Sequence, residues 1–173
     1  MGIDSAPTPY RLRPITPSDR TGLTQFYAGL SADSAMARFH GVAPTIPDGT
    51  AMFFCGPDHE HREGIVAECL DAGGDPRIIG HVCIEPIDVD LAEMAIAVAD
   101  AWQHHGVGRA LLAHTITWAQ AHGIDRLAAS VLSGNAAMFG LLGSAGRPVF
   151  YGACAEGEVD AYLDVRSSRP VAA

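Results

Sequence analysis

The residues best placed to do chemistry lie in the segment Gln103 to Gly108, which reads QHHGVG. An apolar run from Met94 to Ala99 comes shortly before it, and a long amphipathic pattern follows it directly. A strand that passes through a glycine-containing loop into a helix presents backbone N–H groups at the positive end of the helix dipole. Such an end binds phosphate oxygens without a cationic side chain. The segment therefore predicts a phosphate-binding loop.

Three phosphate-binding patterns compete for this loop. The Walker pattern needs Gly-Lys followed by Ser or Thr, and the chain contains no lysine. The dinucleotide pattern G-x-G-x-x-G needs a third glycine where Leu111 stands, and it belongs to a strand earlier in a chain. The pattern Q/R-x-x-G-x-G/A remains, and QHHGVG matches it.

The charge balance of the chain narrows its possible partners. It carries 20 acidic residues and 11 basic residues, all of them arginine, for a formal net charge of -9 at pH 7. Non-specific nucleic-acid binding draws on clustered basic side chains, so we expect no nucleic-acid partner. No segment approaches the roughly 18 apolar residues of a membrane helix, so we expect no membrane partner either.

Cysteine and histidine spacing gives no sign of a metal site. The four cysteines form no C-x-x-C pair, and His59-Glu60-His61 has the wrong spacing for a helical zinc motif. Buried free thiols are typical of a reducing compartment, and the chain shows no secretory signal pattern. We therefore predict a cytoplasmic protein without a metal.

The elements that must position the loop follow an α/β order within one domain. A length of 173 residues suits a single core, expected at about residues 10–166 with loose termini. Residues 41–63 contain no readable motif and are expected to be loops. Expected strands are Tyr10–Ile15, Gly64–Leu70, Arg77–Ile84, Glu93–Ala99, Leu127–Leu132, Pro148–Cys154 and Val159–Val165. Expected helices begin at Thr16, with Asp19 as capping-box partner, and cover Asp33–His40, Gly106–His122 and Asn135–Gly143.

The loop and its flanks resemble the acetyl-CoA pyrophosphate loop of the GNAT N-acetyltransferase superfamily. The likeness includes the preceding strand AEMAIAV, the later strand LAASVL and the helix start SGNAAM, and covers about Glu93 to Gly146. The runs YRLRPITPSD and GLSADSAMARF are similar to the GNAT domain of bacterial Pat-type protein lysine acetyltransferases. The resemblance implies the GNAT fold, with a mixed, splayed sheet of about six or seven strands flanked by helices.

The resemblance also implies roles for particular residues, with acetyl-CoA as cofactor. Val98 and its strand neighbours, Ile96 among them, would hydrogen-bond the pantetheine arm and polarise the thioester. Asn135 and Met138 match the family's N-x-x-A/M pattern and would contact the cofactor. Backbone amides of the loop would hold the pyrophosphate; these belong to Gln103, His104, His105, Gly106, Val107, Gly108, Arg109 and Ala110.

Glu93 matches the glutamate that serves as general base in Pat-like enzymes. An alkylammonium with a pKa near about 10.4 must lose a proton before it attacks a thioester, and a carboxylate can take that proton. A strand-end carboxylate that merely faces water is the alternative. The tyrosine that many GNAT enzymes use as general acid is replaced by Leu142, and the usual Gly-Phe reads Gly146-Arg147.

Several alternatives remain open at this stage. The leading acceptor is a protein lysine, a polyamine or aminoglycoside-like amine is the second candidate, and a homodimer is possible. Because Leu142 replaces the acid, a CoA-binding sensor without catalysis is a further candidate. Arg38 is expected to form a salt bridge at a helix end, with contact to substrate or cofactor as the alternative.

Overall fold

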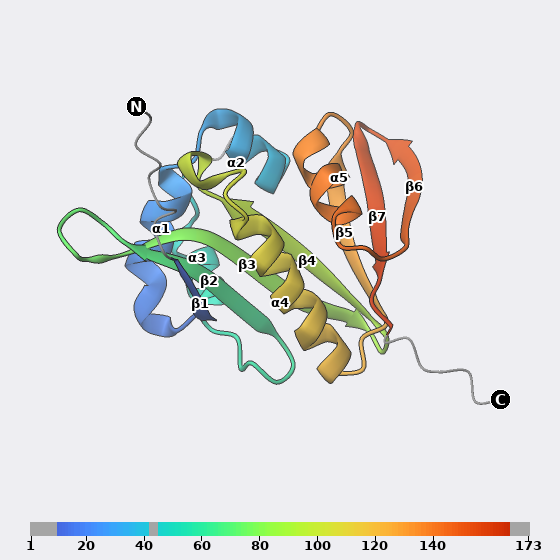
Figure 1. Cartoon of the computed structure of the whole chain (residues 1–173), viewed down its shortest axis with the longest axis horizontal. Coiled ribbons are helices and arrows are strands. Elements are labelled where there is room, and N and C mark those ends of the chain that lie inside the picture. The colour runs from blue at the N-terminus through green and yellow to red at the C-terminus, as the bar shows by residue number, and fades with distance from the viewer. Residues whose placement is uncertain (1–9, 42–44, 167–173) are drawn as a thin grey trace, which may run out of the picture.

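The computed structural model describes residues 10–41 and 45–166, and the expected loose termini lie outside these residues. Seven strands form one sheet in the order β1-β2-β3-β4-β5-β7-β6 (Figure 1). The strands are β1 (Arg11–Pro14), β2 (Glu63–Leu70), β3 (Pro76–Asp88), β4 (Leu91–Val98), β5 (Arg126–Leu132), β6 (Val149–Ala155) and β7 (Glu158–Asp164). The helices are α1 (Arg20–Ala28), α2 (Ala32–Phe39), α3 (Asp48–Phe54), α4 (Val107–Ala121) and α5 (Ala136–Gly143), with short 3-10 turns η1 (Pro17–Asp19) and η2 (Asp100–Trp102).

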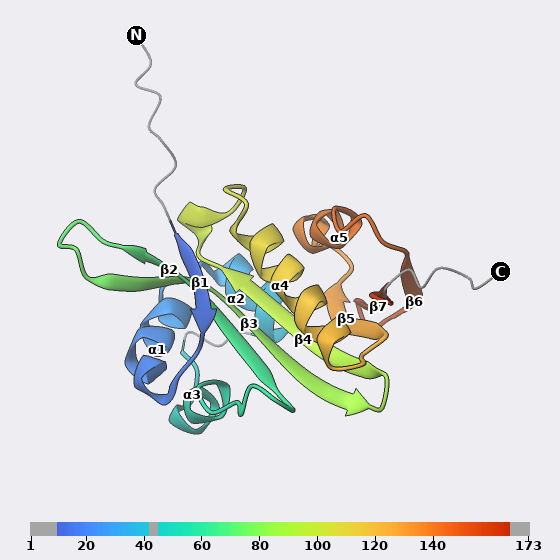
Figure 2. The ribbon, with the colours of Figure 1, turned by 60° about the horizontal axis from the view of Figure 1, so that its bottom comes forward.

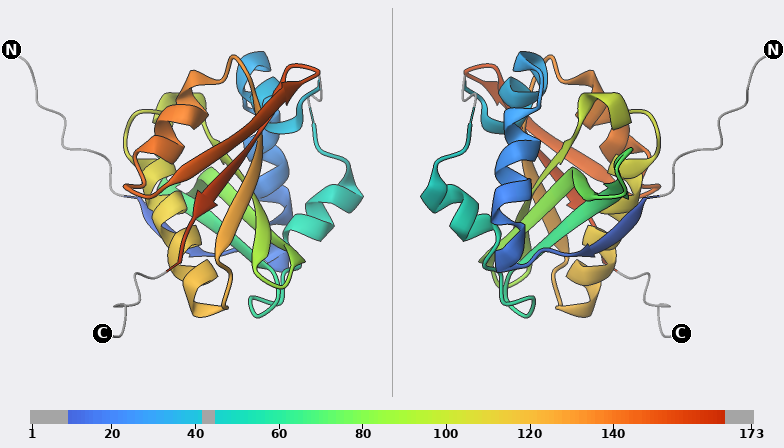
Figure 3. Two further views of the ribbon diagram at one scale, coloured as in Figure 1. Left: turned by 90° about the vertical axis from the view of Figure 1, so that its right-hand side faces the viewer. Right: turned by 90° about the vertical axis from the view of Figure 1, so that its left-hand side faces the viewer.

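The sheet has mixed polarity because one neighbouring pair runs in parallel. β4 and β5 are parallel, whereas the other paired neighbours are antiparallel. The parallel pair needs a crossover, and α4 supplies it. The hairpin of β6 and β7, red in Figure 3, continues the sheet beyond β5. The prediction of a mixed α/β fold with six to seven strands is confirmed.

Helices cover both faces of the sheet, as Figure 2 shows, with α4 on one side and α1 and α3 on the other. The alternating side chains of the strands supply two separate cores. Val107, Leu111 and Leu112 of α4 pack with residues of β2 to β5, and Leu23 and Phe26 of α1 pack in the second core. Each helix is held on the sheet mainly by the burial of its apolar face.

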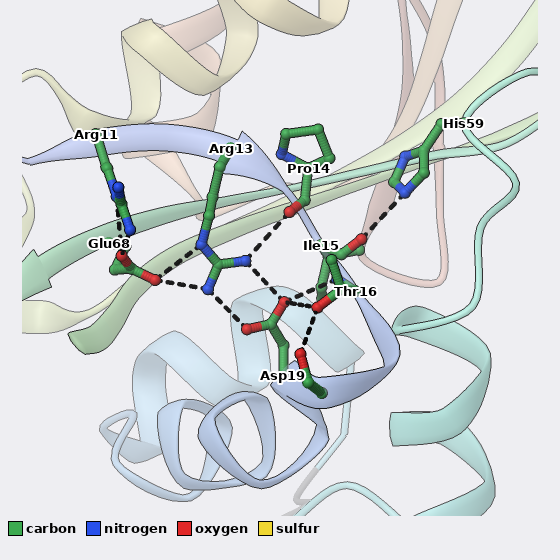
Figure 4. A network of polar contacts seen from close by, with 9 residues as sticks. Arg11, Arg13, Pro14, Ile15, Thr16, Asp19, His59 and Glu68 are labelled. Carbon is green, nitrogen blue, oxygen red and sulfur yellow. Dashed lines mark hydrogen bonds and ion pairs between the residues drawn. The ribbon is translucent and has the colours of Figure 1, made fainter. Parts of the chain in front are cut away.

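The edge strand β1 is held by a closed network of polar groups (Figure 4). Arg13 donates to Asp19 Oδ2 at 2.8 Å and to Glu68 Oε2 at 2.6 Å, and Arg11 donates to Glu68 Oε1 at 2.7 Å. The Thr16 amide donates to Asp19 Oδ2 at 2.8 Å, so the predicted helix start at Thr16 is confirmed. Every charged group in this network has an opposite charge beside it.

The structure contains a helix, α3, where the sequence pattern predicted only loops. Pro47 stands at its N-cap with an extended backbone, and Asp48 in its first turn lies near the positive end of the helix dipole. Ala51 and Cys55 are buried four residues apart against α1. The helix is short, and packing rather than propensity stabilises it, so the pattern gave a weak signal.

Candidate active site

A cleft opens where β4 and β5 separate. The two strands pair only from Leu91 with Arg126 to Glu93 with Ala128, although β4 continues to Val98 and β5 to Leu132. The cleft has a volume of about 910 Å³ and is lined by β4, β5, α2, α5 and the loop before α4. α2 and α5 lie at the upper end of the sheet in Figure 1.

The backbone of β4 presents unpaired groups to this cleft. The Ala99 amide donates to the Ile79 carbonyl at 2.8 Å, which sets the register with β3. Because backbone groups alternate along an antiparallel strand, Met94, Ile96 and Val98 turn theirs away from β3 and toward the β5 side. The Met94 amide serves the last paired step with β5, and the Val98 carbonyl accepts from Gln103 Nε2. Both groups of Ile96 and the Val98 amide therefore face the cleft without a partner among the described residues. β5 has already diverged at that point, so a ligand with amide groups can pair with this edge.

The N-terminal end of α4 presents a group of free amides. Gly106 is the N-cap residue and has a left-handed φ of 86°, a conformation that glycine adopts without steric cost. In the part of the chain that the structure describes, no amide from His104 to Arg109 donates to another protein group. The first turn of α4 carries no acidic residue that would compete for this positive end.

The amides at the two ends of the predicted set are already used. The Ala110 amide donates to the Gly106 carbonyl at 3.0 Å, and the Gln103 amide donates to the Asp100 carbonyl at 3.3 Å. The predicted range of loop amides, Gln103 to Ala110, therefore includes one amide too many at each end. The amides left without a protein partner among the described residues, and so able to bind a ligand, are those from His104 to Arg109.

The side chains of Gln103 and Asp100 join the loop to α2. Gln103 Nε2 donates to Ser34 Oγ at 2.9 Å and to the Val98 carbonyl at 3.3 Å. Asp100 accepts from Ser31 Oγ at 2.6 Å and from Ser34 Oγ at 2.7 Å. Burial would raise the pKa of Asp100, but these hydrogen bonds outweigh it and lower that pKa. The loop, β4 and α2 are thus held together on one side of the cleft.

Most of the residues predicted for the site line this cleft. Three of them do not: His105 is exposed and bonds the Gln103 carbonyl through Nδ1, Val107 is buried in the core, and Ala110 lies within the helix. Their backbones still shape the loop. Those that line the cleft are Glu93, Ile96, Val98, Gln103, His104, Gly106, Gly108, Arg109, Asn135 and Met138.

Asn135, at the start of α5, caps the helix and also lines the cleft. Its Oδ1 accepts from the Met138 amide at 3.0 Å and so caps the helix. This bond uses the side-chain oxygen and leaves the NH₂ group, and Asn135 lines the cleft. The capping bond fixes the side chain at the mouth of the split between β4 and β5.

Glu93 lies where the two strands separate, and its side chain is exposed to the cleft. It makes no hydrogen bond or ion pair with the residues in the described ranges 10–41 and 45–166, so its oxygens are free to accept a proton. Leu142 is 1% exposed and belongs to the core beneath α5. The position that carries a tyrosine in many relatives therefore offers no acid here.

The cleft also includes residues of α2, among them Ser34, which the sequence did not assign to the site, and Arg38, for which contact with substrate or cofactor was the alternative prediction. The expected salt bridge of Arg38 is wrong, because no carboxylate pairs with Arg38 among the residues described. The run GLSADSAMARF contained both residues, but only the packing of α2 over the cleft shows where they point.

The described residues fit the parts of coenzyme A that need protein partners. Free amides at a helix start suit a diphosphate, and the unpaired edge of β4 suits the amides of a pantetheine arm. Among residues 10–41 and 45–166 no group of three or more His, Cys, Asp or Glu is arranged to hold a metal ion. Within those same residues, no helix is long and apolar enough to cross a membrane.

Comparisons with known proteins agree with this architecture. The model of the acetyltransferase (GNAT) family matches residues 34–146, which include the loop and the split. The GNAT domain of S. lividans PAT has a similar structure, with 32% identity over 90% of each chain and a TM-score of 0.79.

Two more distant structures share the fold. An acetyltransferase from Salmonella typhimurium, solved with acetyl-CoA, has 18% identity, a TM-score of 0.70 and coverage of 95% of this chain and 99% of that one. The ribosomal-protein-S18-alanine N-acetyltransferase of Escherichia coli has 19% identity, a TM-score of 0.65 and the same coverage.

A sheet split beside a helix start with free amides defines the class of acetyl-CoA-binding acyltransferases. The chain belongs to the GNAT acetyltransferase family. It is an acetyl-CoA-dependent N-acetyltransferase that acts on an amine acceptor, which confirms the predicted activity and cofactor. Membership of this family favours catalysis over the alternative of a CoA-binding sensor.

Proposed function

We propose that this enzyme acetylates the side-chain amine of lysine residues in proteins. The observation that carries the proposal is the likeness to Pat-type domains along most of the chain, including 32% identity with the GNAT domain of S. lividans PAT. The net charge of -9 supports it, since an acidic surface attracts cationic lysine-bearing segments.

Glu93 acts as the general base in this proposal. Its exposed carboxylate stands at the apex of the split, free of protein partners among the described residues. An incoming ammonium donates its proton to that carboxylate, directly or through one water, and the amine then has a lone pair for attack. Glu93 returns the proton to solvent through the open side of the cleft.

The loop amides from His104 to Arg109 hold the diphosphate, and the β4 edge holds the pantetheine arm. When bound, acetyl-CoA supplies an electrophilic thioester. The free N–H groups of β4 point into the split and can stabilise negative charge on a carbonyl oxygen there. Asn135 offers its side-chain NH₂ group from the opposite wall, because its Oδ1 is used to cap α5.

Leu142 cannot act as an acid, because its side chain is aliphatic, and it lies buried in the core. A thiol has a pKa near about 8.5, so a thiolate leaves without help near neutral pH. The proposed mechanism therefore relies on Glu93 to accept the proton of the acceptor, and predicts that activity rises with pH as the acceptor amine loses its proton.

The test uses acetyl-CoA labelled in its acetyl group, incubated with the enzyme and a cell lysate. Label in protein bands that is lost when their lysines are blocked beforehand supports the proposal. Label only in small molecules would instead assign a polyamine or aminoglycoside-like acceptor. A Glu93→Gln enzyme run in parallel shows which labelling depends on the proposed base.

A further inference from the structure

The cleft contains a cation that the mechanism above does not use. The guanidinium carbon of Arg38 lies 4.9 Å from the ring centre of Phe39, 5.4 Å from that of Phe54 and 6.0 Å from that of Tyr27. Arg38 also lines the cleft beside Glu93. A cation held against aromatic faces keeps its charge while it loses contact with water.

The hydrogen-bonding capacity of Arg38 is largely unused. Nη2 donates to Cys83 Sγ at 3.4 Å, and sulfur is a weak acceptor. Nε is buried and has no partner among the described residues. Nη1 also makes no hydrogen bond with the described residues, and the half-buried Arg38 side chain lines the cleft, where a ligand can meet it.

The groups around Arg38 do not neutralise its charge. Burial raises the pKa of the Cys83 thiol and that of the Tyr27 phenol, so both remain uncharged near neutral pH. His81 bonds the Tyr27 hydroxyl through Nδ1 at 2.8 Å, and burial together with the charge of Arg38 lowers the pKa of His81 to about 3. Burial would lower the pKa of Arg38, and the charge of Glu93 in the same cleft helps to raise it, but Glu93 makes no ion pair with Arg38 among the described residues, and the groups packed against the guanidinium are neutral. Such an arrangement is costly unless a ligand supplies a bonded anion.

Arg38 lies away from the diphosphate end of the site. Ser34 of the same helix bonds Gln103 of the loop, and Arg38 is one turn farther along, at about 6 Å. His40, two residues after Arg38, bonds Glu158 of β7 through Nδ1 at 2.9 Å and so anchors this end of α2 across the cleft. The anion that meets Arg38 thus comes from the acceptor side.

Glu93 and Arg38 make a pair of opposite charges that line one cleft without joining. No ion pair links them in the described part of the chain. We propose that the acceptor carries a carboxylate as well as the reacting amine, and that Arg38 binds this carboxylate while Glu93 meets the amine. This inference rests on the proposed N-acetyltransferase function and specifies the acceptor of the same site.

Two sources can supply that carboxylate. In a protein acceptor it belongs to an aspartate or glutamate next to the target lysine. In a small acceptor it is the carboxylate of an amino acid. Both use the charge-assisted hydrogen bonds that a guanidinium makes with a carboxylate.

The test compares matched acceptors that differ in one charge. One arm uses lysine and lysinamide, and the other uses a lysine peptide with Glu or Gln next to the lysine. We expect the carboxylate member of at least one pair to have a kcat/KM about tenfold higher. This ratio should fall to about one in Arg38→Met, be partly kept in Arg38→Lys and be fully kept in Arg126→Gln, which removes a charge outside the cleft.

The ratio within a pair does not depend on the fraction of enzyme that is folded, so a destabilised variant still gives an answer. Calorimetric titration of the same pairs into the enzyme with CoA reads the preference even if no amine is acetylated, which separates this inference from the proposed function. Equal binding and equal kcat/KM within both pairs would overturn the inference. A tenfold loss of acetyl-CoA affinity in Arg38→Met would also overturn it, because Arg38 would then serve the cofactor.

Discussion

Arg13 and Arg38 are both partly buried cations, but they differ in the partners that surround them. Arg13 of β1 bonds the carboxylates of Asp19 and Glu68, whereas Arg38 of α2 packs against aromatic rings and hydrogen-bonds only a thiol among the described residues. The same contrast extends to backbone groups. Amides near Thr16 find partners within the chain, and those from His104 to Arg109 do not.

This difference separates stability from function. A polar group that is paired inside the protein lowers the free energy of the fold, while one that is left unpaired in a cleft is available to a ligand at some cost in stability. The β1 edge therefore serves the fold, and the cleft between β4 and β5 serves the reaction. Substitutions in the two regions should separate these effects.

The largest effect on stability is expected from Glu68→Ala. Glu68 is 4% exposed and bonds both Arg11 and Arg13, so its loss leaves two cations without their shared anion. We expect the free energy of unfolding to fall by about 3 kcal/mol, with kcat/KM of the remaining folded enzyme unchanged. Urea unfolding measures this. The exposed Glu60→Ala should change stability by less than about 0.5 kcal/mol, and equal losses in both variants would contradict the account.

The next effect concerns the loop amides. Gly106→Ala places a side chain on a residue with φ of 86°, and we expect the dissociation constant for acetyl-CoA to rise about tenfold. At Gly108 an added Cβ meets Leu141 at an ordinary 3.5 Å, so Gly108→Ala should stay within about threefold. Calorimetric titration with acetyl-CoA measures both. Equal affinity in the two variants would show that the loop conformation does not matter.

The closed network also predicts a pH dependence of stability. Burial would raise the pKa values of Asp19 and Glu68, but hydrogen bonds from Arg13, together with those from Thr16 or Arg11, outweigh it and lower both. Their contribution is thus present above the unfolded pKa near about 4 and is lost as the pH falls through the lower folded values. Between about pH 6 and pH 3, wild type should lose about 1 kcal/mol more than Glu68→Gln. Parallel unfolding curves at each pH would refute this.

The smallest expected effect on stability comes from replacing Arg38, and it tests the comparison of the two arginines directly. Arg38→Met replaces an uncompensated cation with an apolar side chain among Phe39, Phe54 and Tyr27. We expect the free energy of unfolding to stay the same or rise by up to about 1 kcal/mol, whereas Arg13→Met should lower it by about 2 kcal/mol. Thermal and urea unfolding of the two variants compare these values. A larger loss for Arg38→Met would mean that Arg38 serves the fold.

Local patterns predicted much of the fold and part of the site. The helix start at Thr16, the loop QHHGVG and the apolar run of β4 depend on neighbours in sequence, so they could be predicted directly. The unpaired state of Arg38 and the use of the Gln103 side chain to join β4 with α2 depend on contacts between distant segments. Helix α3 was missed because tertiary packing decides it.

The most direct test of the account compares Glu93→Gln with Glu85→Gln. Glu85 lies opposite Glu93 on β3 and bonds Arg62, but it does not line the cleft, so it is a matched control. Initial rates of acetyl transfer are measured for both variants from about pH 6 to pH 9, with acetyl-CoA affinity measured in parallel. We predict that kcat/KM falls at least about 100-fold in Glu93→Gln and changes less than about threefold in Glu85→Gln, with acetyl-CoA affinity unchanged in both. Full activity of Glu93→Gln across that range would contradict the account.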